Sequence, residues 1–90
     1  MNNIIELEFP DDIHMLAGNK LGVEIFNTQV KDKIDYSKIN IIKFPVQIKA
    51  IAISFVKGLT STIPEEEFIK HFRVVANGSL ADKFKEDFLF

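Results

Sequence analysis

The sequence predicts a small α/β domain, with a mostly parallel sheet and helices packed against it. Two kinds of segment alternate along the chain. One kind has the apolar–polar alternation or the β-branched composition of strands, and in the other kind apolar residues recur at helical spacing. The helical connections are long, and such connections favour parallel neighbouring strands joined by right-handed crossovers. We therefore expect the element order β-α-β-α-(α)-β-α within a single domain that spans residues 1–90.

The first two predicted elements are a strand and a helix. Residues 4–9 alternate apolar with polar side chains, which is typical of a half-buried strand, and this strand could pair in either direction. Its buried face contains Ile5, Leu7 and Phe9. A turn at Gly18 precedes an amphipathic helix over residues 21–34. The buried face of this helix contains Val23, Phe26, Val30 and Ile34.

A central strand is predicted over residues 39–44, where β-branched residues form an almost continuous apolar run. Such a run is typical of a strand covered on both faces. Pro45 ends the strand because proline has no N–H to donate to a sheet. Residues 46–53 have an extended character that fits either a short strand or a packed loop.

The second half of the chain predicts further helices and one more strand. Ser54 is a candidate N-cap for a helix. The apolar face of that helix contains Phe55, Val56, Leu59 and Ile63. Pro64 fits the first turn of a short helix, with the acidic residues 65–67 near its positive end. We expect Phe68 and Phe72 to anchor this short helix, and residues 73–76 to form a strand.

A last helix is predicted near the end of the sequence. Ser79 is its candidate cap, and one apolar face contains Leu80, Phe84 and Phe88.

Composition excludes several functional classes. With a net charge of −2 and Arg73 as its one arginine, the chain lacks the clustered cations of nucleic-acid binders. It has no cysteine, so neither disulfides nor thiolate metal sites form. No apolar run approaches the length of a membrane span, and the start lacks the pattern of a signal peptide. We expect a cytoplasmic protein.

No residue pattern predicts catalysis, a metal site or a cofactor. His14 and His71 lie far apart in the sequence without metal-ligand spacing, and neighbouring acids of a helix do not face one pocket. The chain has no nucleophile elbow and no glycine-rich phosphate loop. The segment 77–79 fits either an anion-binding turn or, more simply, a turn followed by a cap. We therefore expect a protein that is not an enzyme.

Residues 34–88 resemble the STAS-like domains, a family of uncharacterised bacterial proteins related to anti-sigma factor antagonists. The strand at 40–44 and the extended segment 46–53 carry part of the resemblance. The segment AISFVKGL at 52–59 is similar to the family's serine-containing helix start, and EFIKHFRVVAN at 67–77 is similar to its short helix running into a strand. The helix that begins near Gly18 fits the family's preceding helix.

The resemblance implies a compact α/β fold of the antagonist type and a role in protein–protein regulation. The implied partner is an ATPase of the histidine-kinase type, which binds ATP itself. In the antagonists an acid precedes the phosphorylated serine, whereas this chain has Ala52 and Ile53 at those two positions. Ser54 matches the neighbouring serine, and it is either a helix cap or a phosphoacceptor whose added charge alters docking.

Three functional hypotheses follow. In the first, the chain binds a partner through Ser54 and the exposed side of its helix, where we expect Lys57, Thr60 and Ser61. In the second, it self-associates as an assembly module through its apolar ending, residues 88–90. In the third, it is an enzyme or a small-ligand binder, which needs a pocket with converging polar groups, such as a deep polar cleft around residues 77–79.

Overall fold

The structure, a computed structural model, describes residues 2–76 and confirms a small α/β fold. Its main sheet has three strands in the order β1 (Asn2–Glu6), β3 (Ile39–Lys43) and β5 (Phe72–Val75). A second, two-stranded sheet pairs β2 (Met15–Leu16) with β4 (Ala50–Ile51). All of these pairs are parallel, so the first strand, for which either direction was open, runs parallel to its neighbour.

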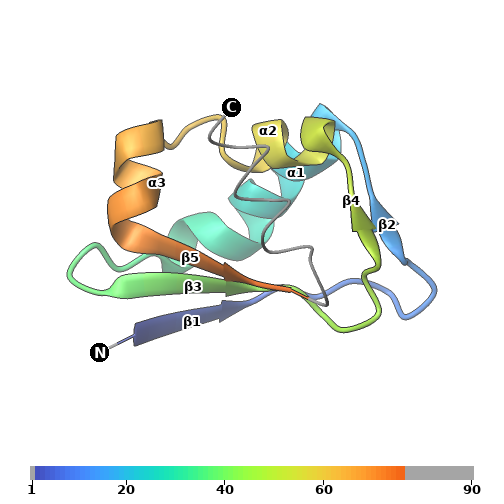
Figure 1. Ribbon diagram of the computed structural model, residues 1–90, viewed down its shortest axis with the longest axis horizontal. Coiled ribbons are helices and arrows are strands. Elements are labelled where there is room, and N and C mark those ends of the chain that lie inside the picture. The colour runs from blue at the N-terminus through green and yellow to red at the C-terminus, as the bar shows by residue number, and fades with distance from the viewer. Residues whose placement is uncertain (1, 77–90) are drawn as a thin grey trace.

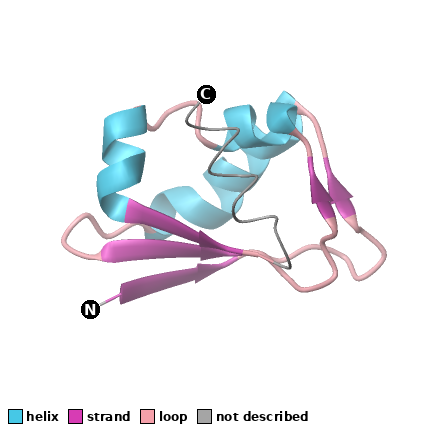
Figure 2. Ribbon diagram, viewed as in Figure 1, coloured by secondary structure: helices cyan, strands magenta, loops and turns pink. Residues whose placement is uncertain are grey.

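The helices of the described region are α1 (Asn19–Ile25), α2 (Ile53–Leu59) and α3 (Glu65–His71). They lie on one side of the three-stranded sheet, and β2 and β4 stand at one end of the molecule (Figure 1). No described helix covers the other side of that sheet (Figure 2). Over residues 2–76 the main sheet and the helices therefore form two layers.

The core lies between the main sheet and the helices. Strand alternation turns Ile5, Leu7, Ile42 and Phe44 inward, and all four are buried. Phe55 of α2 is fully buried and meets Phe44 edge-on, with ring centroids 6.3 Å apart. The predicted inward face of the first strand is confirmed at Ile5 and Leu7, although β1 itself ends at Glu6.

The predicted helix 21–34 is helical over most of its length but changes its hydrogen bonding. After α1 the chain continues as a π-helix over Phe26–Val30 and a short 3₁₀ turn over Lys31–Lys33. Phe26 and Val30, predicted on the apolar face, are buried at 7% and 0% exposure. The amphipathic pattern was therefore informative about burial but not about the hydrogen-bonding period.

Two predictions in the second half are corrected by the structure. Phe72 does not lie on the short helix but begins β5, because α3 ends at His71. Its ring still stacks on that of Phe68, with centroids 5.2 Å apart. Ile63 is buried as expected, but it lies in the turn after α2 rather than on the helix. The helix predicted from Ser79 lies outside the described residues.

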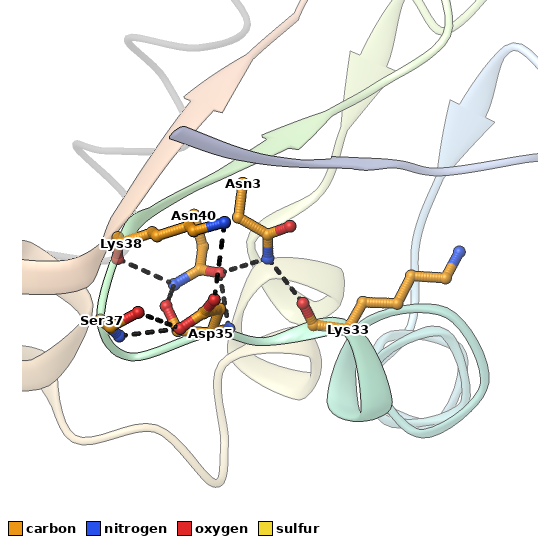
Figure 3. A network of polar contacts seen from close by, with 6 residues as sticks. All are labelled: Asn3, Lys33, Asp35, Ser37, Lys38 and Asn40. Atoms are coloured by element: carbon orange, nitrogen blue, oxygen red, sulfur yellow. Dashed lines mark hydrogen bonds and ion pairs between the residues drawn. The ribbon is translucent and has the colours of Figure 1, made fainter. Parts of the chain in front are cut away.

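Asn40 ties the start of the main sheet to the preceding loop (Figure 3). Its side chain is fully buried, and its Oδ1 accepts hydrogen bonds from Asn3 Nδ2 at 2.7 Å and from the Asp35 N–H at 2.9 Å. Its Nδ2 donates to the carbonyl oxygens of Asp35 and His71. A buried amide with both ends satisfied stabilises the fold, so we assign Asn40 a structural role.

Candidate functional site

The helices α1 and α2 are in close contact at two glycines, Gly22 of α1 and Gly58 in the last turn of α2. An added methyl group at Gly22 would lie less than 3 Å from the backbone of Phe55 and Leu59, and one at Gly58 would meet the backbone of Asn19. The backbones of the two helices are therefore in direct contact, and a side chain larger than that of glycine at either position would prevent this contact. Sequence reasoning missed this contact, although a glycine inside a helical pattern often has such a packing reason.

Ser54 lies in the first turn of α2 and bonds to the start of α1. Its Oγ accepts a hydrogen bond from the backbone N–H of Gly18 at 2.9 Å. Gly18 has a φ of 100°, a backbone conformation that glycine adopts at little cost. The N-cap of α2 is Ala52, and no side chain caps the helix. The expectation that Ser54 caps α2 is therefore wrong: its hydroxyl joins two helix starts instead.

The two-stranded sheet brings the chain to both helix starts. Met15 is in register with Ala50 and Leu16 with Ile51, and the N–H of Ala52 donates to the Leu16 carbonyl at 2.8 Å. Because side chains alternate along a strand, Leu16 and Ile51 are buried while Met15 is 60% exposed. In the segment 46–53, for which a short strand and a packed loop were both open, Ala50 and Ile51 form β4, Ile53 begins α2, and the other residues lie in turns or loop.

An exposed surface results at the end of the molecule where β2, β4 and the start of α2 meet (Figure 1). We define the junction face as Met15, Ala50, Ile53 and Lys57. Ile53 is 46% exposed, and Lys57, one helical turn later, is exposed as well. The junction face therefore combines two exposed apolar side chains, one small residue and one cation.

Lysines dominate the charge of the segments that form this junction. Lys20 lies in the first turn of α1, Lys49 directly precedes β4, and both are exposed. Neither α1 nor α2 has an acidic residue in its first turn. The positive end of each helix dipole thus adds to the lysine charges rather than being offset by a carboxylate.

The residues predicted to bind a partner differ in their exposure to solvent. Lys57 and Ser61 are exposed, as expected, and Ser54 is half-buried. Thr60 is only 5% exposed, and its hydroxyl donates to the Val56 carbonyl at 2.8 Å. The expectation that Thr60 lies on the exposed side of the helix is therefore wrong. Sequence reasoning also missed Met15, because its strand is too short to show a period.

Other polar groups of the described region form no recognisable reaction centre. Within residues 2–76, no three or more histidine or acidic side chains converge on a point where they could hold a metal ion. A shallow depression follows α1, lined by Asn19, Lys20, Val23, Glu24, Asn27 and Thr28. His71 lies 3.4 Å from Glu67 on α3, an ordinary pair one helical turn apart.

Asp35 has a perturbed acidity with a local cause. Hydrogen bonds from the hydroxyl and the backbone N–H of Ser37, together with nearby Lys38, hold the pKa of Asp35 below its ordinary value. These contacts close the turn before β3, and they explain the lowered pKa of an exposed carboxylate without any partner from outside the turn. Residues 65–67 lie in the first turn of α3, as predicted, where the helix dipole favours acidic side chains.

Comparisons with known proteins add no relatives. No family model matches the chain, and no curated protein or solved structure matches it significantly. The similarity to STAS-like domains therefore stays a prediction. In the region from 2 to 76, none of the helices has both the length and the apolar character needed to cross a membrane.

Proposed function

We propose that this chain is a regulatory, non-enzymatic module that docks another protein through the junction face. The observation that carries the proposal is the exposure of Met15 and Ile53 beside Lys57, on a surface whose backbone is firmly held. Exposed apolar side chains with a polar rim are typical of protein contact sites. A single exposed apolar side chain would not indicate a contact site. Here there are two, Met15 on β2 and Ile53 at the start of α2, and β2 is paired with β4, which leads into α2.

Because the junction is rigid, docking there would cost little conformational entropy. Backbone contact through Gly22 and Gly58 fixes the crossing of α1 and α2, and the bond from Gly18 to Ser54 fixes their starts. A surface that is already ordered loses less entropy on binding than a mobile loop does. The flexible Met15 side chain adds the ability to fit an irregular partner surface.

Charge at the junction indicates the chemistry of the partner. Lys20, Lys49 and Lys57 are exposed cations at or beside the junction, although the chain has a net charge of −2 and the exposed acids Asp11 and Asp12 precede β2. An acidic partner surface with an apolar centre would complement the junction face and would be steered toward it. Following the resemblance to STAS-like domains, we propose as partner an ATPase of the histidine-kinase type, met in the cytoplasm.

Two versions of this function differ in the role of Ser54. In the first, Ser54 is a structural link whose oxygen accepts the Gly18 N–H, and docking needs no modification. In the second, Ser54 is phosphorylated, which breaks this link and adds about two negative charges beside the exposed lysines, so that an acidic partner is released. The half-buried position of Ser54 and its engaged oxygen favour the first version.

The test is affinity capture from cells that naturally express the protein, read by quantitative mass spectrometry. Tagged wild type is compared with Lys57→Glu, with Ser54→Asp and with Lys70→Glu, a matched charge reversal on exposed α3. We expect an ATPase of the histidine-kinase type with wild type and Lys70→Glu, and its loss with Lys57→Glu. Equal recovery with Ser54→Asp would remove the switch and leave docking intact. Equal recovery with both charge reversals would refute the proposed surface.

The alternative of self-association through residues 88–90, and that of a ligand cleft near 77–79, fall outside the described residues and stay predictions.

A further inference from the structure

Within residues 2–76, one edge of the main sheet has backbone groups without a hydrogen-bond partner. β1 has β3 on one side only, and it forms an outer edge of the sheet (Figure 2). The N–H of Leu7, just after β1, donates to the Lys43 carbonyl at 2.9 Å, so the backbone of Leu7 faces β3. Because backbone direction alternates along a strand, Asn3 and Ile5 face β3 too. The N–H and C=O groups of Asn2, Ile4 and Glu6 therefore point away from the sheet.

The protein closes this edge immediately after β1. Glu8 is the next residue whose backbone N–H and C=O point away from β3. The side chain of Gln29 bonds to both groups, in place of a neighbouring strand. The Glu8 N–H donates to Gln29 Oε1 at 2.7 Å, and Gln29 Nε2 donates to the Glu8 carbonyl at 2.9 Å. Among residues 2–76, none bonds to the outward backbone groups of Asn2, Ile4 or Glu6. The free edge thus has a defined length, with Ile4 at its centre.

We propose that β1 pairs with β1 of a second copy of this chain, antiparallel and with the two-fold axis at Ile4. Ile4 then faces Ile4 of the second copy, and Asn2 faces Glu6. All outward residues fall at hydrogen-bonded positions of the new ladder, so each unpaired N–H and C=O gains a partner. The result is a continuous sheet across the two copies.

The side chains of β1 favour pairing with β1 of a second copy. Ile4 is 59% exposed on the side of the sheet that no described helix covers, and pairing places it against Ile4 of the second copy. The acid Glu6 meets the neutral amide of Asn2, so no like charges face each other across the axis. The strand also has no proline or lysine, the residues that commonly guard sheet edges against pairing.

The size of the contact limits its strength. A stable interface buries about 800 Å² on each partner, which is more than one short strand supplies. We therefore expect a weak dimer whose population rises with protein concentration. The contact involves β1, whereas docking involves the junction face at the β2–β4 end of the molecule, so neither proposal depends on the other (Figure 1).

Cysteine crosslinking tests the pairing and its register, because the natural chain has no thiol. In the proposed dimer the two Ile4 Cα atoms lie about 5.5 Å apart, which is within disulfide range. The two Glu6 Cα atoms are displaced by four residues, about 14 Å, which is out of range. We expect Ile4→Cys to form a covalent dimer under mild oxidation by oxidised glutathione, and the matched control Glu6→Cys to stay monomeric. Equal crosslinking of both, or of neither, would overturn the proposal.

A pair of charge variants gives an independent sign test. Asn2→Lys places a cation opposite Glu6 of the second copy and is expected to strengthen the dimer in sedimentation velocity. Asn2→Glu places two acids together and is expected to weaken it. If both variants shift the equilibrium in the same direction, the register is wrong. If β1 amides are protected from hydrogen exchange only when a different protein is added, the edge takes a foreign strand and self-pairing is wrong.

Discussion

The close crossing of α1 and α2 makes a quantitative prediction about Gly58. Alanine normally stabilises a helix interior by about 1 kcal/mol relative to glycine. At Gly58, however, the new methyl group would meet the backbone of Asn19 at less than 3 Å, and backbone atoms cannot rotate away as a side chain can. Overpacking of this kind costs about 1–3 kcal/mol. Because the contact is with backbone, we place this cost at the upper end, about 3 kcal/mol. Subtracting the gain of about 1 kcal/mol from helix propensity, we expect Gly58→Ala to destabilise the fold by about 2 kcal/mol.

Thermal and urea unfolding followed by circular dichroism measure this effect. For a domain of this size, 2 kcal/mol lowers Tm by about 8–16 °C. The matched control is Lys20→Ala, at an exposed position of α1, which is expected to change stability by less than about 0.5 kcal/mol. A Gly58→Ala variant with unchanged or higher Tm would refute the close approach of the helices.

The double variant sharpens the same argument. Gly22→Ala forces α1 away from the backbone of Phe55, in the same crossing that Gly58→Ala disturbs. Once the helices have separated for one methyl group, the second costs less. We therefore expect the double variant to lose less free energy of unfolding than the sum of the two single losses, with a difference of about 1 kcal/mol. Strict additivity would mean that the two glycines do not share one contact.

Three further predictions concern polar groups. Asn40→Ala leaves the Asp35 N–H and the His71 carbonyl unpaired, so we expect a loss of about 3 kcal/mol in urea unfolding, and a loss below about 0.5 kcal/mol would contradict this role. Because turn hydrogen bonds lower the pKa of Asp35, its contribution is complete above the ordinary value of about 3.9 and disappears as pH falls through the folded pKa. Asp35→Asn should therefore flatten the acid limb of stability against pH, and an unchanged limb would contradict it. Ser54→Ala removes the acceptor of the Gly18 N–H and should cost about 1 kcal/mol, whereas an unchanged Tm would show the bond to be dispensable.

The strands of the main sheet could be predicted because their signals are local. Alternation identified Ile5 and Leu7 as inward-facing, and the β-branched run identified β3. The limits of the elements could not be predicted in the same way. Phe72 fits a helix by its spacing from Phe68, but it is in register with Asn40 in the sheet, and only the folded chain reveals this competition.

The junction was less predictable because it depends on contacts between distant segments. Serine is a common helix cap, yet the Oγ of Ser54 accepts its hydrogen bond from the N–H of Gly18, 36 positions earlier in the chain. The strands β2 and β4 have two residues each, too few to show a period. Thr60 looks polar in the sequence, but a hydroxyl bonded to the carbonyl four residues earlier can be buried at little cost.

The most direct test of docking through the junction face is site-specific photocrosslinking in cells that naturally express the protein. A photoreactive residue replaces Ile53, which is 46% exposed, or Ile69 of α3, which is 50% exposed and serves as the matched control. We predict that only the Ile53 position becomes crosslinked to a partner protein, identified by mass spectrometry as an ATPase of the histidine-kinase type. Crosslinking at Ile69 alone, or equally at both positions, would contradict docking through this face.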